Sequence, residues 1–209
     1  MNTRIPLLLL RHGHTEWSRG GRYQGRSDLP LALEGRAQAR QLGRRLQGQG
    51  VVSVFTSPLR RASETAAIVA ESLGLGIPRV DPRLAEIAYG QWEGMTQAEI
   101  RLHWPDQLRR WKRAPDAAAA PAGESLAELR QRLNEFFSDS LWHQPIAGGV
   151  LIVSHLGPIR VALLQAAQQP LSLFRQIPVP TASVHHLMLG CSQGKFRLSA
   201  KIQEKNPCA

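Results

Sequence analysis

Residues 7–15 read LLLLRHGHT, four leucines followed at once by Arg11, His12 and Gly13. Four leucines in a row indicate an apolar strand, and α/β folds place ligands in the crevice beyond the carboxyl ends of such strands. An arginine offers a planar fork of donors that matches phosphate, and a histidine is a nucleophile near neutral pH. The glycine lets backbone approach a ligand closely. The stretch therefore predicts an α/β fold with an anion site at a strand end, although one Arg-His pair in an arginine-rich chain is weak evidence by itself.

The length and composition fit a single domain. A chain of 209 residues with 43% hydrophobic residues can build one sizeable α/β domain and is short for two. The apolar run at residues 5–10 is too short to span a membrane, and Arg11 and His12 interrupt it where the apolar core of a signal peptide would continue. Cys191 and Cys208 allow at most one disulfide, and we expect both thiols to be free. The sequence thus predicts a soluble, cytoplasmic protein without a membrane partner.

The net charge of +10 raises the question of a nucleic-acid partner, since basic proteins accumulate on polyanions. The distribution of the charge argues against one, because the basic residues are almost all arginines scattered over predicted helices. The chain has no basic tail, helix-turn-helix pattern, RNP-like motif or cysteine-histidine finger. We expect no specific nucleic-acid binding and only weak non-specific adhesion.

Strand-like and helix-like segments alternate along most of the chain. Apolar residues recur at helical spacing from Gly35 to Leu46 and from Ala62 to Leu73. This alternation predicts an α/β protein with a mostly parallel central sheet and helices on both faces, closed by an edge hairpin around residues 190–194. The expected strands are residues 5–10, 51–56, 77–80, 150–154, 184–189 and 196–202.

The pattern breaks down between Trp92 and Ser125, where two tryptophans and an alanine- and proline-rich run at 114–121 occur. We interpret about residues 95–125 as an inserted lid with a flexible arm, which we call the lid segment. Trp104 and Trp111 could stack there on a flat ligand group. In the alternative, the lid segment is a surface helix whose tryptophans cover the core.

Three later segments could supply partners for the first motif. Arg60, in SPLRRASET at 57–65, follows a predicted strand and opens a helix, where anions bind. Glu86, in LAEIAYGQWEG at 84–94, has apolar and aromatic neighbours, which suit a carboxyl group to proton transfer. His155, in IVSHLG at 152–157, again places a histidine at a strand end. Taken singly, these could be an exposed helix arginine, a solvated carboxylate and a structural histidine.

Together, and in this order, the four segments resemble the histidine phosphatase superfamily, also called phosphoglycerate-mutase-like. The resemblance spans about residues 7–189 and includes YQGRSDLPL at 23–31 and GES at 123–125. It implies one histidine phosphatase domain over residues 1–209, with no cofactor and no metal. It also implies the site roles: His12 as the nucleophile that becomes phosphorylated, Glu86 as proton donor, Arg11, Arg60 and His155 as a clamp on the phosphoryl oxygens, and Ser18 and Gln24 as further phosphate contacts.

The implied chemistry is consistent with these residue types. Neutral His12 would attack phosphorus in line with the departing alcohol, which splits one difficult displacement into two easier ones. The two arginines and a protonated His155 would neutralise the transferring oxygens, as Mg²⁺ does in other phosphoryl-transfer enzymes. Glu86 would protonate the leaving oxygen and then accept a proton from the water that hydrolyses the phosphohistidine.

The sequence departs from the family pattern at three positions. His14 stands where relatives more commonly carry Glu or Gln, and Ser18 stands where they carry Asn. Ser18 can still donate a hydrogen bond, but its reach differs, so the departures affect substrate positioning more than the reaction. Ala32 stands where relatives often have a Ser or Thr helix cap.

The compact chain and its single lid segment look more like the phosphatase branch than the longer mutases. Within that branch the α-ribazole phosphatases are similar, and the resemblance implies a small phosphorylated substrate, with α-ribazole-5'-phosphate as the favoured one. Two alternatives stay open: a phosphoglycerate mutase, and a catalytically weak binding module on the same fold. The sequence leaves the oligomeric state open, with a homodimer as one arrangement.

Overall fold

The computed structural model describes residues 4–142, 146–192 and 195–200. Its centre is a six-stranded sheet in the order β3-β2-β4-β1-β5-β6. The first four of these strands run parallel, β5 is antiparallel to β1, and β6 pairs with β5 as an edge hairpin. The predicted mostly parallel sheet is therefore confirmed. The strands are β1 (Ile5–Arg11), β2 (Val51–Thr56), β3 (Arg79–Val80), β4 (Gly149–Ser154), β5 (Val184–Ser192) and β6 (Lys195–Ala200).

Most strand bounds agree with the sequence pattern. The predicted strand at 51–56 is observed as β2 with the same bounds. The prediction was too long at 77–80, where only Arg79–Val80 pair with β2. Pro78 has no N–H to donate to the ladder, and Ile77 is 96% exposed beyond the sheet edge. The hairpin turn at 193–194, the predicted continuation of the last strand to 202, and Cys208 lie outside the described residues.

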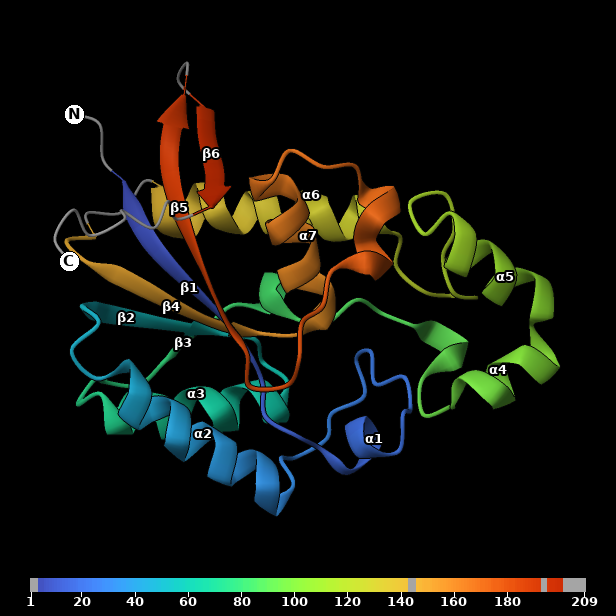
Figure 1. Cartoon of the computed structure of the whole chain (residues 1–209), viewed down its shortest axis with the longest axis horizontal. Coiled ribbons are helices and arrows are strands. Elements are labelled where there is room, and N and C mark those ends of the chain that lie inside the picture. The colour runs from blue at the N-terminus through green and yellow to red at the C-terminus, as the bar shows by residue number, and fades with distance from the viewer. Residues whose placement is uncertain (1–3, 143–145, 193–194, 201–209) are drawn as a thin grey trace, which may run out of the picture.

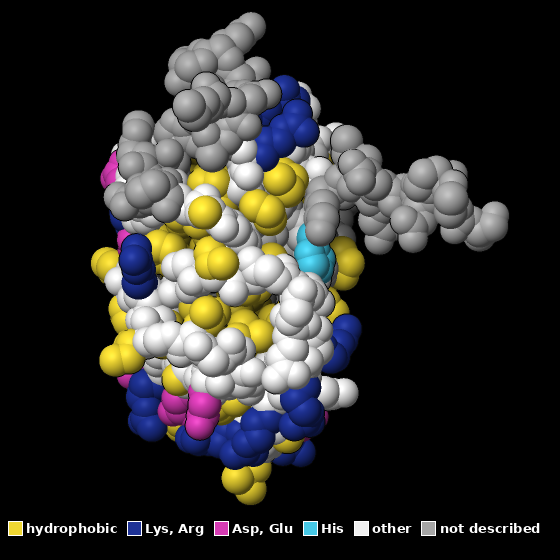
Figure 2. All heavy atoms as spheres, turned by 90° about the vertical axis from the view of Figure 1, so that its left-hand side faces the viewer, with side chains coloured by type: hydrophobic (Ala, Val, Ile, Leu, Met, Phe, Trp, Pro, Cys, Tyr) yellow, Lys and Arg dark blue, Asp and Glu magenta, His cyan; other side chains and the backbone are white. Residues whose placement is uncertain are grey.

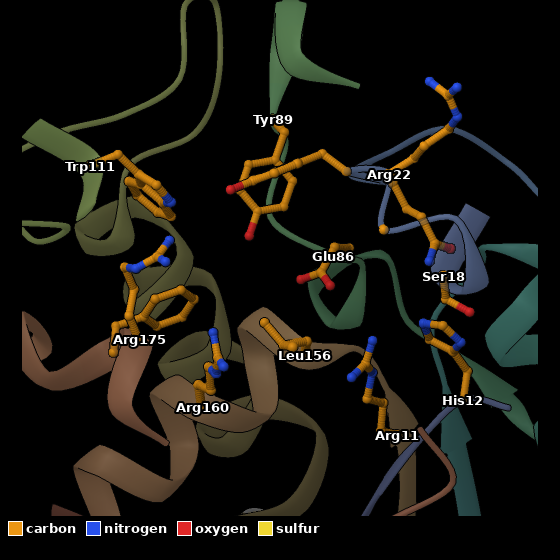
Figure 3. Close-up of a pocket in the computed structure, with 14 residues that line it drawn as sticks. Arg11, His12, Ser18, Arg22, Glu86, Tyr89, Trp111, Leu156, Arg160 and Arg175 are labelled. Atoms are coloured by element: carbon orange, nitrogen blue, oxygen red, sulfur yellow. The ribbon is translucent and has the colours of Figure 1, made fainter. Parts of the chain in front are cut away.

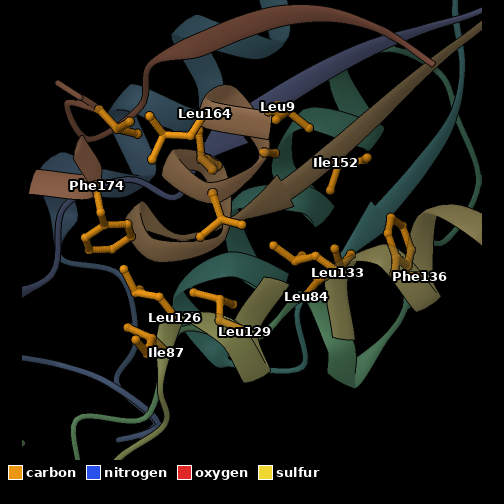
Figure 4. Close-up of a cluster of buried hydrophobic side chains, with 14 of the residues drawn as sticks. Leu9, Leu84, Ile87, Leu126, Leu129, Leu133, Phe136, Ile152, Leu164 and Phe174 are labelled. Atoms are coloured by element: carbon orange, nitrogen blue, oxygen red, sulfur yellow. The ribbon is translucent and has the colours of Figure 1, made fainter. Parts of the chain in front are cut away.

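Helices cover both faces of the sheet, as predicted (Figure 1). Alternate leucines of β1 point to opposite faces, which explains why all four are buried. Leu8 and Leu10 join a cluster with α2 (Leu33–Leu46) and α3 (Arg60–Ser72). Leu7 and Leu9 join the larger cluster with α6 (Leu126–Phe136) and α7 (Leu156–Ala166). Figure 4 shows that larger cluster, in which Leu9, Ile152, Leu133, Phe136 and Leu164 lie together.

The lid segment folds into two short helices, α4 (Gln97–His103) and α5 (Pro105–Arg113), which lie beyond one end of the sheet (Figure 1). Trp111 is only 2% exposed, and its ring makes edge contacts with Tyr89, Trp92 and Phe174. Trp104 is partly buried against the same cluster. The alternative in which these tryptophans cover the core is therefore the one observed.

The remaining short elements connect these layers. They are α1 (Glu16–Arg19), the 3-10 helices η1 (Pro82–Leu84), η2 (Gly90–Trp92) and η4 (Leu171–Gln176), and the π-helical turn η3 (Phe137–Trp142). Among the described residues, every helix is too short or too polar to cross a lipid bilayer. Figure 2 shows the side of the molecule opposite α4 and α5, where the Lys and Arg side chains form separate groups with uncharged surface between them.

Candidate active site

A cavity of about 270 Å³ opens beyond the carboxyl ends of β1 and β4 (Figure 3). Five of the seven predicted site residues line it, namely Arg11, His12, Ser18, Gln24 and Glu86. His155 lies against His12, with ring centroids 5.1 Å apart. The structure thus brings together predicted residues from three of the four segments that carry the family resemblance. Arg60 is not among them.

His12 follows β1 and is almost completely buried, at 2% exposure. Its backbone N–H donates to Ser154 O at 3.1 Å, which ties the end of β1 to the end of β4. Its Nδ1 lies 2.7 Å from Gly13 O, and because a carbonyl oxygen only accepts, Nδ1 carries the proton and Nε2 keeps its lone pair. Burial, together with the charges of Arg61 and Arg11, lowers the pKa of His12 well below its usual range. The imidazole is therefore neutral, with a nucleophilic nitrogen available.

Gly13 has a role in packing that the sequence analysis did not predict. A Cβ at this position would lie 2.5 Å from Gly35 O, so the glycine allows the segment after β1 to pack directly on α2. Its N–H also donates to Thr65 Oγ1 on α3 at 3.2 Å. The turn that presents His12 is therefore held by α2 and α3, and the glycine is needed for backbone packing.

A partly buried arginine, Arg11, and a fully buried one, Arg61, lie near His12. Arg11 donates from Nη1 to Val179 O at 2.6 Å, and Arg61 donates to Ser27 O and Gly25 O, both at 2.7 Å. Burial lowers the pKa of Arg61 to about 10, so it is charged at neutral pH. The Nε atoms of Arg11 and Arg61 are both buried without a hydrogen-bond partner among the described residues. Such unpartnered, charged donors are costly unless a ligand accepts from them.

The prediction that Arg60 is one of the arginines of the site was wrong, and the next residue, Arg61, lies near His12 instead. The Arg60 side chain is exposed and reaches Glu64 at 3.5 Å, while its backbone N–H donates to Asp28 Oδ1 at 2.7 Å. Successive residues of a helix point about 100° apart, so only one of two adjacent arginines can face the sheet. Arg61 is four residues before the buried Thr65, and that spacing was the sequence signal that distinguishes it from Arg60.

Glu86 follows η1, lies against the first turn of α7 and is 6% exposed. Its Oε1 accepts from the backbone N–H groups of Ile87 at 3.0 Å and Gly157 at 2.9 Å. A Cβ at Gly157 would lie 2.4 Å from Oε1, so the carboxylate depends on a glycine in the first turn of α7. Oε2 has no donor among the described residues, and Figure 3 shows the carboxyl group within the cavity. Glu86 is thus held in place through one oxygen and leaves the other for a substrate.

His155 is the N-cap residue of α7 and is fully buried. Its Nε2 lies 2.8 Å from Ser57 Oγ, which itself accepts from Leu59 N at 3.2 Å. The Ser57 hydroxyl can either donate to Nε2 or accept from it, and His155 Nδ1 is a buried atom without a partner in the described residues. Burial, with the charges of Arg61, His12 and Arg11, lowers the pKa of His155 well below its usual range. This shift favours the neutral imidazole in the free protein, whereas the sequence analysis expected a protonated His155.

Two of the three departures from the family pattern, His14 and Ser18, contact each other. Ser18 Oγ donates to Thr15 O at 2.8 Å and accepts from Thr15 N at 2.9 Å, within the capping box of α1. His14 Nδ1 lies 3.1 Å from Ser18 Oγ, and His14 Nε2 lies 2.9 Å from Thr181 Oγ1. The Ser18 proton is thus already used. Gln24 accepts from Thr15 Oγ1 at 3.1 Å, which leaves its amide N–H groups for a ligand.

The cavity also contains residues that the sequence analysis did not single out. Arg160 lies one helical turn after the cavity residue Leu156 on α7, a spacing that could have indicated it. Arg175 comes from η4, where no pattern in the sequence points to it. In the described parts of the chain, no three His, Cys, Asp or Glu side chains form a group that could hold a metal ion. The other additional lining residues include Arg22, Tyr23, Tyr89 and Phe174, and Trp111, which the sequence analysis had considered as a stacking residue, lines the cavity as well.

Comparison with known proteins identifies the family. Residues 7–201 match the model of the histidine phosphatase superfamily (branch 1). Phosphoserine phosphatase 1 of Hydrogenobacter thermophilus is 34% identical, over 94% of this chain and 98% of that protein. A mycobacterial glucosyl-3-phosphoglycerate phosphatase, solved with VO3, superposes with a TM-score of 0.85 at 28% identity, over 95% and 98% of the two chains. A protein of Escherichia coli K-12, provisionally assigned as an α-ribazole-5'-P phosphatase, superposes with a TM-score of 0.77 at 25% identity, over 94% and 95%. With the match extending from β1 to the end of the sheet, this chain belongs to the histidine phosphatase superfamily.

Proposed function

We propose that this protein hydrolyses phosphomonoesters through a phosphohistidine at His12. The observation that carries the proposal is the arrangement around Nε2 of His12, which keeps its lone pair because Nδ1 is bonded to Gly13 O. Three buried nitrogens without partners among the described residues belong to its neighbours: Nε of Arg11, Nε of Arg61 and Nδ1 of His155. A tetrahedral dianion beside His12 would accept from all three. The phosphatases among its relatives support this function.

In the first step, Nε2 of His12 attacks phosphorus and the bond from phosphorus to the ester oxygen breaks. Arg11 and Arg61 neutralise the charge on the three equatorial oxygens in a site that excludes most water. The departing alkoxide takes a proton from Oε2 of Glu86, the oxygen that the backbone does not hold. In the second step, the Glu86 carboxylate accepts a proton from water, which attacks the phosphohistidine and releases phosphate and neutral His12.

The fixed cations of Arg11 and Arg61 support a second part of the proposal, that hydrolysis needs no metal ion. Both guanidinium groups are anchored to backbone carbonyls, so the positive charge is in place before the substrate binds. Activity should therefore persist in excess EDTA. Loss of most of the activity, with recovery on addition of a divalent ion, would contradict this part alone.

The main test is trapping of the phosphoenzyme with labelled substrate. Wild-type protein quenched in base should carry a label that survives base and is lost in acid, as expected for phosphohistidine. His12→Ala should carry none and should lose turnover. His103→Ala is the matched control, because His103 is an exposed histidine of α4 that lies outside the cavity, and it should label like wild type. Equal labelling of His12→Ala, or no label in any form of the protein, would refute the proposal.

We further propose that the lid segment, residues 95–125, limits which substrates enter, because α5 contributes Trp111 to the cavity wall. The finer proposal of α-ribazole-5'-phosphate as substrate finds support in the likeness to the Escherichia coli protein. The packing of Trp111 on three aromatic rings leaves little of its face for stacking, and Trp104 does not line the cavity. Release of phosphate from α-ribazole-5'-phosphate tests this substrate directly. Interconversion of phosphoglycerates without release of phosphate would favour the mutase alternative.

A further inference from the structure

We propose that the ion pair between Glu124 and Arg132 positions Glu86, so that these two residues decide how well Glu86 protonates the leaving group. The proposal rests on the phosphatase function proposed above and adds two positioning residues to it. Glu124 belongs to the GES motif at 123–125, at the end of the lid segment, and Arg132 lies on α6. Neither residue lines the cavity, so each acts through the stretch of chain that carries Glu86.

The backbone around Glu86 is irregular. Residues 85–89 lie between η1 and η2 and belong to no helix or strand, so no helical or β-ladder hydrogen bonds fix them. Ser154 Oγ holds the start of this stretch by donating to Leu84 O at 2.7 Å. The position of the Glu86 carboxylate therefore depends on the contacts that hold the chain beyond Leu84.

The ion pair holds the backbone on both sides of Glu86. Arg132 Nη1 donates to Arg83 O, and Nη2 donates to Glu86 O at 3.2 Å. Further along, Ala88 N donates to Glu124 Oε2 at 3.2 Å, and Glu124 N donates to Ala88 O at 2.9 Å. Arg132 joins the two sides, because its Nε and Nη2 donate to the two carboxylate oxygens of Glu124 at 2.6 Å and 3.0 Å.

This pair has the geometry of a strong contact. The side chains of Arg132 and Glu124 are 14% and 12% exposed, and a two-bonded arginine-carboxylate pair is both stronger and more exact in direction than a single bond. Arg26 also lies 3.5 Å from Glu124, but its side chain is 41% exposed. A Cβ at Gly123 would lie 2.7 Å from Ala88 O, so the glycine before Glu124 allows the close approach of the two segments.

Loss of the pair should affect proton donation more than phosphate binding. It would free the backbone of Glu86 and move Oε2 relative to the ester oxygen, whereas His12 and Arg11 are held by β1 and Arg61 by α3. A misplacement of about 1 Å can cost about 10²-fold in rate. The loss should grow with the need of the leaving group for a proton. A merely structural role would lower the rates for all substrates alike.

The test compares benzyl phosphate, whose alkoxide needs a proton to depart, with p-nitrophenyl phosphate, whose phenolate needs little. The measured quantity is kcat/KM, because it reports the steps up to departure of the alcohol. Arg132→Gln should lower kcat/KM about 10- to 100-fold for benzyl phosphate and less than about 3-fold for p-nitrophenyl phosphate. Glu124→Gln keeps the shape of the side chain and should change the ratio of the two values in the same direction. Circular dichroism identifies the folded variants, and either one decides.

A double variant shows whether the effect passes through Glu86. Glu86→Gln removes the proton donor, so adding Arg132→Gln to it should not change the ratio of the two kcat/KM values further. Arg36→Gln is the matched control, because Arg36 pairs with Glu64 at 2.8 Å and neither residue lines the cavity. It should have the ratio of wild type.

An unchanged ratio in Arg132→Gln and Glu124→Gln would overturn the proposal, as would a further fall in the double variant, while turnover by wild type leaves the phosphatase function standing. If wild type hydrolyses neither substrate and forms no phosphohistidine, the proposed function fails, and amide hydrogen exchange decides the positioning. The N–H of Gly157 donates to Glu86 Oε1, so in Arg132→Gln it should exchange faster relative to the amides of β4. An unchanged relative rate would refute the positioning of Glu86.

Discussion

The adjacent arginines that open α3 allow a direct test of the site geometry, by replacing each with lysine. Arg61 is fully buried and donates to Ser27 O and Gly25 O, both at 2.7 Å. Arg60 is exposed, and within the described residues its guanidinium has a polar contact with Glu64 alone, at 3.5 Å. Both substitutions keep the charge, so any difference between them reflects hydrogen-bond geometry and position.

The magnitude follows from the two carbonyl oxygens that Arg61 serves. One ammonium group at the end of a lysine cannot reproduce two donors set apart by a planar fork, so at least one buried carbonyl loses a charged donor. Loss of one such bond costs about 1.5–3 kcal/mol, and we expect Arg61→Lys to lower the free energy of unfolding by that amount. Arg60→Lys should stay within about 0.5 kcal/mol of wild type, as usual for surface substitutions.

The catalytic effect should separate in the same way. The Nε of Arg61 is a buried donor without a partner in the described part of the chain, and lysine has no equivalent group. Removal of one donor to a charged transition state typically lowers kcat by about 10²- to 10³-fold, which we expect for Arg61→Lys. Arg60→Lys should have the kcat of wild type.

Urea unfolding and steady-state hydrolysis of p-nitrophenyl phosphate measure the two effects on the same protein samples. Activity must be measured where circular dichroism shows that Arg61→Lys is folded. If Arg60→Lys loses activity while Arg61→Lys keeps it, the position of α3 in our account is wrong. Equal losses in both variants would indicate that charge alone, and not the buried geometry, is what the site requires.

Three further predictions concern proton transfer, pH and helix capping. Glu86→Gln should lower the rate about 10²- to 10⁴-fold for a poor alcohol leaving group and much less for p-nitrophenolate, and equal losses would show that Glu86 only positions the substrate. Burial lowers the pKa values of His12 and His155 in the folded protein, so below pH about 6.5 the unfolded chain binds more protons than the folded one. The free energy of unfolding, measured in urea, should therefore fall as the pH drops below that value, by up to about 1.4 kcal/mol per pH unit for each histidine. The slope should be smaller in His155→Gln, and an unchanged slope would mean that His155 is not neutral in the folded protein. Ala32 is the N-cap residue of α2 and makes no side-chain hydrogen bond to the first turn, so Ala32→Ser should raise the free energy of unfolding by about 0.5–2 kcal/mol and leave the kinetics of hydrolysis unchanged. A destabilised variant would show that this buried position cannot accept a hydroxyl group.

The sequence by itself determined the features that depend on local periodicity. The four leucines of β1 alternate between two cores, and the apolar spacing from Gly35 to Leu46 places α2 on the sheet. Motifs at strand ends also determined where the cavity forms, because parallel strands bring their carboxyl ends to one edge of the sheet. Glu86 does not follow a strand, and the family resemblance placed it in the site of His12; both residues line the cavity.

Only the tertiary structure decided between neighbours and between protonation states. The sequence contains Arg60 and Arg61 side by side, and the rotation of α3 against the sheet decided which of them is buried. The protonation state of His155 depends on burial and on Arg61 and Arg11, which come from other elements, so no local pattern encodes it. Arg160 and Arg175 meet in one cavity wall because η4 packs against α7. Periodicity specifies which face of an element is buried, whereas the side chains that meet across elements depend on how those elements pack.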